Sequence, residues 1–262
     1  MMQSQVRKTG GIFFDLEGAK FIVDPGPCSL VHAHSLKLEP EKWNGVMLSH
    51  YHVDNACDSN ALLDGMKDPF LVAEEHCILP REKFKKKFNY YPCITPYHHK
   101  LVKQLHPVKN SDSVSVGSMK VTAVKAVHDD PCVGFVIKHP KITVGYAADG
   151  IYYKGQEKAY EGCDVLILNV IVPKGQKPEI NKHMSVDGAI EFVRSMEKKP
   201  KLIVVHHLSF WMLRSNIFKQ IKIIQDATKV RTINSEDFME LDLEKLTTRI
   251  LSIVSPKVFR VV

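Results

Sequence analysis

Short apolar runs separated by turn residues fill the first two-thirds of the chain, and this pattern is typical of β-strands. The runs stop at prolines, glycines or polar residues. The run at 164–172, DVLILNVIV, shows no alternation, as expected for a strand covered on both faces. Strands are expected within 11–18, 20–26, 45–50, 69–76, 113–128 (two strands around a turn at Gly117), 133–150 (a hairpin) and 164–172, with a helix at 61–66.

Helical and strand patterns alternate in the last third of the chain. The segment 185–197 has apolar residues at helical spacing, and Ser185 stands before it as an N-cap. A second helix is expected at 216–228, and strands at 201–207, 230–235 and 238–243. No linker or repeat divides the chain, so we expect one domain over residues 1–262. The order of elements predicts an α+β fold, an αββα four-layer sandwich of two sheets with helices outside.

The composition is that of an ordinary globular protein. Hydrophobic residues make up 44% and charged residues 25% of the 262 residues, and no apolar run reaches the roughly 18 residues of a membrane helix. The N-terminal residues lack the apolar core of a secretory signal, and the six cysteines lack CxxC spacing. We therefore expect a cytoplasmic protein with reduced thiols and no membrane partner.

The formal net charge of +7 is partly concentrated at 81–92, REKFKKKFNYYP. One interpretation is a basic arm that contacts an anionic substrate, nucleic acid included. The other, which we favour, is an amphipathic helix that turns its lysines to solvent and its aromatic rings to the core.

Four apolar runs end at residues that can bind a metal ion. His50, His128 and Asp149 each follow such a run, and so does the pair His206–His207. The strand ends of a layered fold converge on a cleft, where binding groups usually lie. One such histidine alone would more often be a hydrogen-bonded structural residue, but four ends of this kind together predict a metal site.

The segment 48–58, LSHYHVDNACD, extends this set. Because one residue separates His50 from His52, both imidazoles can face the same side. Together with His128 they offer three neutral nitrogen donors, which suit zinc. A second, more oxygen-rich set comprises Asp54, Asp149 and His207.

These residues, in this order, resemble the motifs of the metallo-β-lactamase-fold hydrolases, on the side of RNase Z and related phosphodiesterases. The matching stretches are FIVDPGP at 21–27, SHYHVDN at 49–55, VH at 127–128, YAADG at 146–150, HMSVDGAIEF at 183–192 and VVHHLS at 204–209. The resemblance implies a first ion on His50, His52 and His128. It also implies that Asp149 bridges this ion to a second one, held by Asp54 and the last histidine.

The last histidine is expected to be His207, because HLS at 207–209 fits the family pattern better than HHL. His206 is then an outer residue or a weak ligand. Asn55 departs from the family motif HxHxDH, since it stands where the final histidine belongs. An amide oxygen is a weak ligand that suits harder cations than zinc. We therefore expect one or two Zn²⁺ ions, with Mn²⁺ or Fe²⁺ as alternatives and a weakened second site.

Other residues near these motifs have two interpretations each. The resemblance makes Asp24 a carboxylate that orients a metal-binding imidazole, while a turn before proline is the structural alternative. For His183 the resemblance implies a residue that assists the leaving group or contacts phosphate. The structural alternative is a solvent-facing ring at the start of a helix. Asp58 is interpreted as a helix N-terminal carboxylate. His98 and His99 could face the cleft as substrate contacts. No role is expected for His32, His34, His76, His106 and His139.

The resemblance implies a metal-dependent hydrolase in which hydroxide attacks phosphorus or a carbonyl carbon, with Asp54 and His183 as catalytic candidates. A phosphodiester or another small or nucleic-acid-like anionic substrate is favoured by His183 and the basic charge. Hydrolysis of an ester, thioester, lactone or lactam is the alternative chemistry. Asn55 favours a further class, a descendant of the fold that binds metal or nucleic acid without turnover. The oligomeric state stays open, a homodimer included.

Overall fold

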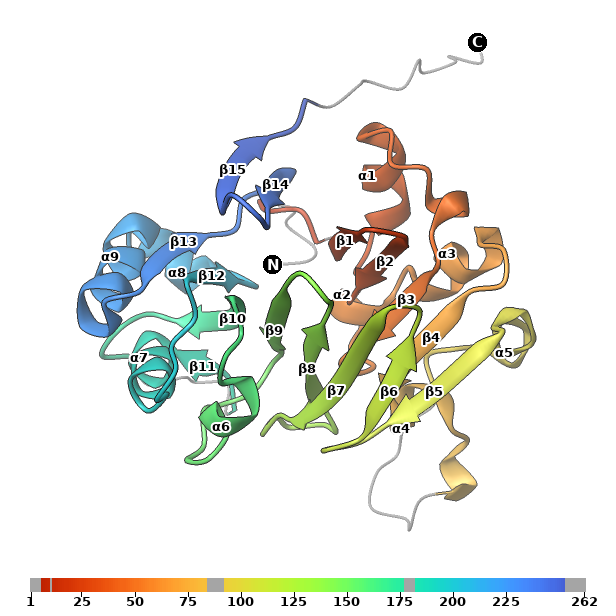
Figure 1. Ribbon diagram of the computed structural model, residues 1–262, viewed down its shortest axis with the longest axis horizontal. Coiled ribbons are helices and arrows are strands. Elements are labelled where there is room, and N and C mark those ends of the chain that lie inside the picture. Colours follow the sequence, from red (N-terminus) through yellow and green to blue (C-terminus); the bar gives the residue numbers. More distant parts are fainter. Residues whose placement is uncertain (1–5, 10, 84–91, 177–181, 253–262) are drawn as a thin grey trace.

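Two β-sheets pack face to face, and helices cover their outer faces (Figure 1). The computed structural model describes residues 6–9, 11–83, 92–176 and 182–252. This arrangement confirms the predicted αββα sandwich. None of the helices in those ranges combines the length and the apolar character needed to cross a lipid bilayer.

The first sheet comes from the N-terminal part of the chain. Within the described residues its spatial order is β1 (Ile12–Leu16), β2 (Ala19–Val23), β3 (Gly45–Leu48), β4 (Phe70–Glu74) and β5 (Gln104–Val108). The two-residue turn between β1 and β2 contains Gly18 at φ 87°, a conformation that glycine adopts freely. β2 to β5 are parallel. The sequence pattern did not predict β5, which contains Pro107 and lies at the sheet edge, where proline is tolerated.

The second sheet is antiparallel in one half and parallel in the other. Its order in the described chain is β13 (Arg231–Asn234), β12 (Leu202–His206), β10 (Val165–Val172), β9 (Thr143–Ala147), β8 (Val133–Lys138), β7 (Met119–Lys125) and β6 (Ser113–Val116), with the short β11 (Met184–Ser185) paired to β10. All of β10 is buried, as its unbroken apolar run predicts. A separate hairpin is formed by β14 (Met239–Asp242) and β15 (Thr247–Ile250), of which only β14 was predicted.

Three helices of the described residues were predicted: α3 (Ser59–Gly65), α7 (Val186–Arg194) and α9 (Ile217–Thr228). The Ser185 hydroxyl caps α7 by accepting a hydrogen bond from the Gly188 amide at 3.0 Å. The sequence pattern did not predict six other helices of the described residues: α1 (Ser29–Ser35), α2 (Val53–Ala56), α4 (Glu75–Ile78), α5 (Pro96–Leu101), α6 (Glu157–Tyr160) and α8 (Phe210–Arg214). Of the basic segment, 84–91 lies outside the described residues, so neither interpretation of it is tested.

The core has three layers. Between the sheets, Phe21 and Met47 of the first sheet pack in one cluster with Phe135 and Val165 of the second. A second cluster lies between the second sheet and α7 and α9, and a third between the first sheet and α1 and α3. This burial of apolar area on both faces of each sheet is the main force that holds the layers together.

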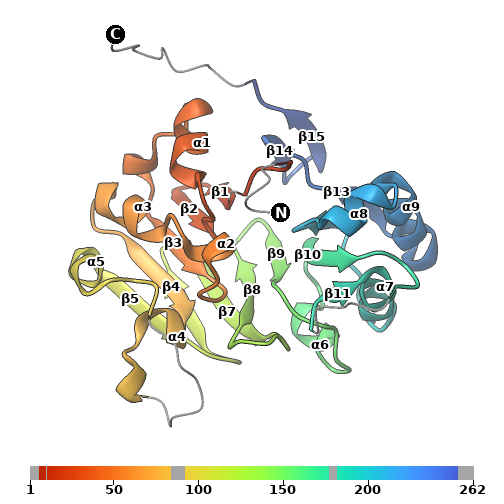
Figure 2. The same ribbon diagram turned by 180° about the vertical axis from the view of Figure 1, so that it is seen from behind.

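The carboxyl ends of the parallel strands lie at one edge of the sandwich. Asp24 follows β2, His50 follows β3, Asp149 follows β9 and His207 follows β12. Figure 2 shows α2, which carries Asp54, at the junction between the two sheets. Chain topology therefore brings residues from distant parts of the sequence to one place.

The loop after β2 touches the backbone of α2 at Gly26. A Cβ atom added to Gly26 would lie 2.1 Å from the carbonyl oxygen of Asp54, far inside van der Waals contact. We expect Gly26→Ala to destabilise the protein by about 1–3 kcal/mol, because one of the two backbone segments must move. Urea unfolding measures this change. Gly65→Ala is the matched control, since a Cβ there meets nothing within 4 Å. Equal midpoints for both variants would disprove the tight contact.

Candidate metal centre

His50 is fully buried directly after β3, and its ring has one defined tautomer. The Ser49 amide and hydroxyl donate to the two carboxylate oxygens of Asp24 at 2.7 and 2.6 Å. Since the hydroxyl hydrogen is used in this way, the Ser49 oxygen accepts from Nδ1–H of His50, which lies 2.9 Å away. Burial lowers the pKa of His50 to about 3, so the ring is neutral. Its Nε2 lone pair is then available to a metal ion.

His52 and His128 are held in the same manner. Nε2 of His52 lies 2.7 Å from one oxygen of Asp130, whose other oxygen accepts from the Tyr51 hydroxyl at 2.6 Å. Burial would raise the pKa of Asp130, but these hydrogen bonds outweigh it and lower the pKa. The carboxylate is therefore ionised and accepts the imidazole proton. Nδ1 of His128 lies 3.3 Å from the backbone oxygen of Lys182, which can only accept.

A cation fits between these rings. With their protons used elsewhere, Nδ1 of His52 and Nε2 of His128 face each other with lone pairs at 3.4 Å. Two lone pairs repel at this distance unless a positive ion lies between them. Nitrogen ligands of a tetrahedral zinc ion lie roughly 3.4 Å apart. The donor nitrogens of His50, His52 and His128 all lie within 4.8 Å of one another, so the three residues form a candidate metal site.

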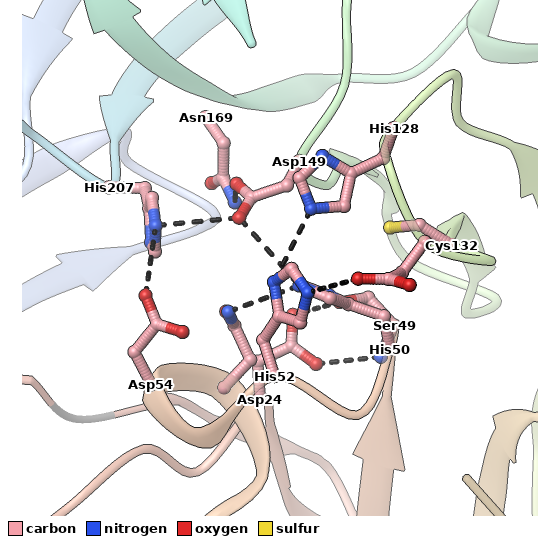
Figure 3. Close-up of polar contacts among 12 residues, drawn as sticks. Asp24, Ser49, His50, His52, Asp54, His128, Cys132, Asp149, Asn169 and His207 are labelled. Atoms are coloured by element: carbon pink, nitrogen blue, oxygen red, sulfur yellow. Dashed lines mark hydrogen bonds and ion pairs between the residues drawn. The ribbon is translucent and has the colours of Figure 1, made fainter. Parts of the chain in front are cut away.

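The second set lies beside the first, and Asp149 faces both (Figure 3). One of its oxygens accepts from the Asn169 amide at 2.9 Å. The other lies 3.8 Å from Nε2 of His50 and 3.5 Å from Nε2 of His207. His207 in turn lies 3.6 Å from a carboxylate oxygen of Asp54. Burial would raise the pKa of Asp149, but the histidines around it, His207 first, lower the pKa below its ordinary value.

Asn55 lies inside the centre and does not turn away from it. The residue is buried on α2, and its amide group lies 3.5 Å from Nε2 of His50. The nitrogen and oxygen of an amide exchange places on a half-turn of the side chain. Asn55 can therefore present its oxygen to a cation or its NH₂ group to His50, but it cannot replace an imidazole donor.

The carboxylate of Asp24 does not cap the turn before Pro25, and it reaches His50 through Ser49. It also accepts from the Tyr146 hydroxyl at 2.6 Å, and Asn169 donates to that hydroxyl at 3.2 Å. Burial raises the pKa of Asp24 to about 6, although the hydrogen bonds from Ser49 and Tyr146 offset part of the effect. A continuous hydrogen-bonded chain thus links the two ligand sets.

Sequence analysis missed Ser49, Asp130, Tyr146 and Asn169. Asn169 did carry a signal, as the single polar residue in an apolar run whose eight positions are all buried. A buried amide there needs hydrogen-bond partners, which the site provides.

Three predicted residues have defined positions around the centre. The His183 ring lies 4.8 Å from the His128 ring, and burial lowers the pKa of His183. Nδ1 of His206 lies 2.9 Å from the Ser235 hydroxyl, and His206 lines the cavity beside the centre together with His207. Asp58 precedes α3, but its carboxylate accepts from the Leu30 amide at 3.0 Å and does not cap its own helix. Asp58 therefore stands at the N-terminal end of α3, as predicted, and its carboxylate contacts the first turn of α1.

His98 and His99 lie on α5, which packs against α3, and neither lines the cavity beside the candidate centre. The structure therefore does not support them as substrate contacts. Nδ1 of His76 lies 2.8 Å from one carboxylate oxygen of Glu74. The other oxygen caps α4 by accepting from the His76 amide at 2.8 Å. His32 lies on α1 with its ring against Phe238.

Comparisons with known proteins agree with this fold. Residues 19–207 match the family model of the beta-lactamase superfamily domain. The uncharacterized protein MJ1374 of Methanocaldococcus jannaschii is 24% identical over 242 residues, which cover 92% of this chain and 89% of that protein.

Two solved structures show the same fold. The metallo-beta-lactamase fold protein YhfI from Bacillus subtilis aligns with a TM-score of 0.68 and 20% identity, over 87% of this chain and 88% of its own. The short form of human tRNase Z aligns with a TM-score of 0.60 and 15% identity, over 93% of both chains. From the match over 19–207 and this shared fold, we conclude that the chain belongs to the beta-lactamase superfamily and has the metallo-β-lactamase fold.

Proposed function

We propose that this protein is a metal-dependent hydrolase that cleaves phosphodiester bonds. The observation that carries the proposal is the close approach of two ring nitrogens, Nδ1 of His52 and Nε2 of His128, which face each other at 3.4 Å. The ionised Asp149 belongs to the same centre. In this arrangement His50, His52 and His128 would hold a first ion. Asp54, Asp149 and His207 would hold a second. Three nitrogen donors favour zinc at the first position, and the more oxygen-rich second position also suits Mn²⁺ or Fe²⁺.

A divalent ion bound here would lower the pKa of a water molecule and polarise a phosphoryl oxygen of the substrate. Asp54, which is partly exposed beside His207, would orient the attacking water and accept its proton. The water oxygen forms a bond to phosphorus as the bond to the leaving oxygen breaks. His183 in its protonated form would pass a proton to that leaving oxygen as the alcohol departs, and would take up another proton from solvent.

Two features support the phosphodiester class over other substrates. His183 stands next to His128, at a distance suited to a substrate bound in the centre. The fold is shared with tRNase Z, whose name denotes cleavage of RNA. Hydrolysis of an ester, thioester or lactone would use the same centre without a phosphate contact. A protein that binds metal without turnover is the candidate that Asn55 favours.

Metal analysis of the purified protein, followed by hydrolysis of bis(p-nitrophenyl) phosphate with added Zn²⁺, Mn²⁺ or Fe²⁺, tests the proposal. Metal-dependent release of p-nitrophenol is expected. Bound metal without release under any of these ions would favour the non-catalytic alternative.

Loss of one donor should empty the first site. We expect His52→Ala to weaken metal binding by more than the roughly 10–100-fold that loss of an outer partner costs, and to bring the metal content well below one ion per chain. Elemental analysis measures this. His34→Ala, on the exposed side of α1, is the control and should keep the parent content. An unchanged content in His52→Ala would refute the ligand assignment.

The second site should respond to restoration of the missing imidazole. In a zinc titration of metal-free protein we expect one tight and one weak binding event for the parent. Asn55→His should bind two ions tightly, because nitrogen suits zinc better than an amide oxygen does. Two tight events in the parent would show that Asn55 does not impair the site.

His183→Ala should lose turnover but keep its metal. Removal of a group that assists proton transfer costs roughly 100-fold or more. The loss should be larger for diphenyl phosphate than for bis(p-nitrophenyl) phosphate, because phenol is the poorer leaving group. Steady-state rates with both substrates measure the difference, and His34→Ala again serves as control. Equal losses on both substrates would argue against a role at the leaving oxygen.

A further inference from the structure

A cavity of about 1030 Å³ opens from one side of the candidate metal centre. Asp54, Asn55, His183 and His207 line it, so it meets the centre at the second ligand set. The cavity continues from there between the two sheets toward the β14–β15 hairpin, which lies at the top of the sandwich in Figure 1. Its volume is at the upper end of the roughly 300–1,000 Å³ found for small-molecule sites. A bound substrate can therefore extend well beyond the reacting atoms.

The far part of this cavity is apolar. Five side chains along it are only partly buried and pack against the core between the sheets: Ile12, Ile142, Met239, Leu241 and Leu243. Each therefore keeps an apolar face toward the cavity. Exposed apolar area in a concave site is a common mark of a binding site for an apolar ligand.

The charges along the cavity disfavour a nucleic acid. In the described chain, the segment 236–244 places five carboxylates along it: Glu236, Asp237, Glu240, Asp242 and Glu244. Three basic residues also line the cavity, Arg7, Lys8 and Lys141, so the carboxylates outnumber them. Lys141 is paired with Glu17 and Glu244, and the cations Arg249 and Lys245 pair with Glu240 and Asp242. A polyanionic backbone would meet like charges here, although the whole chain has a net charge of +7. An uncharged chain would not be repelled by these carboxylates.

We propose that this cavity binds an alkyl group of the substrate, so that the enzyme cleaves a phosphodiester that carries an extended apolar chain. The inference rests on the proposed function for the position of the phosphate, and on the cavity for the class of the remaining group. The phosphate lies at the metal centre, and the alkyl chain runs past His183 and His207 toward Leu241.

Binding of alkyl phosphates to the metal-loaded protein tests this without any turnover. Isothermal titration with butyl, hexyl and octyl phosphate, each below its micelle concentration, keeps the head group constant and varies only the chain. Each buried methylene is worth a factor of roughly four in Kd. We expect octyl phosphate to bind about two orders of magnitude more tightly than butyl phosphate.

Leu241→Gln places a polar group on the cavity wall and should weaken octyl phosphate at least roughly tenfold, since the amide must lose water against an alkyl chain. Butyl phosphate binding and metal content should stay as in the parent. Leu246→Gln is the matched control, because it makes the same change in the same hairpin at a residue that does not line the cavity. It should leave the whole series unchanged.

A Kd independent of chain length in the parent would overturn the inference, and this measurement needs no variant. An oligonucleotide that binds more tightly than octyl phosphate would overturn it as well. A protein that shows the chain-length series but hydrolyses no phosphodiester would disprove the proposed function and leave the alkyl site standing. The two proposals can therefore fail separately.

Discussion

The buried carboxylate of Asp24 is the contact on which the rest of the centre depends. It accepts two hydrogen bonds from Ser49 in its own sheet and one from Tyr146 in the opposite sheet. A carboxylate buried without such donors would cost several kcal/mol. The carboxyl ends of β2 and β3 in one sheet and of β9 in the other must therefore stay close together. The same bonds set the tautomer of His50 and leave its Nε2 facing the ligand set.

Three of the candidate donors are each oriented from behind by a hydrogen-bond partner. Asp130 orients His52, the Lys182 carbonyl orients His128, and Asn169 orients Asp149. Donors held in this way need little rearrangement to receive an ion, which favours binding. Asn55 is the one member of the centre whose chemistry departs from the family pattern.

The two halves of the centre differ in their surroundings. Asp54 and His207 line the large cavity, whereas His50, His52 and His128 do not. Substrate therefore has access to the centre from the side of the second set. The lining of that cavity is apolar and acidic, while the chain as a whole is basic. The charge beside the centre thus differs in sign from the net charge of the chain, and charge acts over roughly 10 Å.

The sequence by itself determined the layered fold, the long strands and helices, and the candidate ligand residues that follow strand ends. Hydrophobic periodicity is a local property, and a motif such as 50–54 lies on one short loop. The tertiary structure alone decided which side chains orient those ligands. Tyr146 meets Asp24 across 122 residues and Asp130 meets His52 across 78, so no local pattern records either pair. The same holds for Asp58, whose carboxylate binds the backbone of Leu30 on a neighbouring helix, because hydrogen-bond partners depend on packing and not on spacing along the chain.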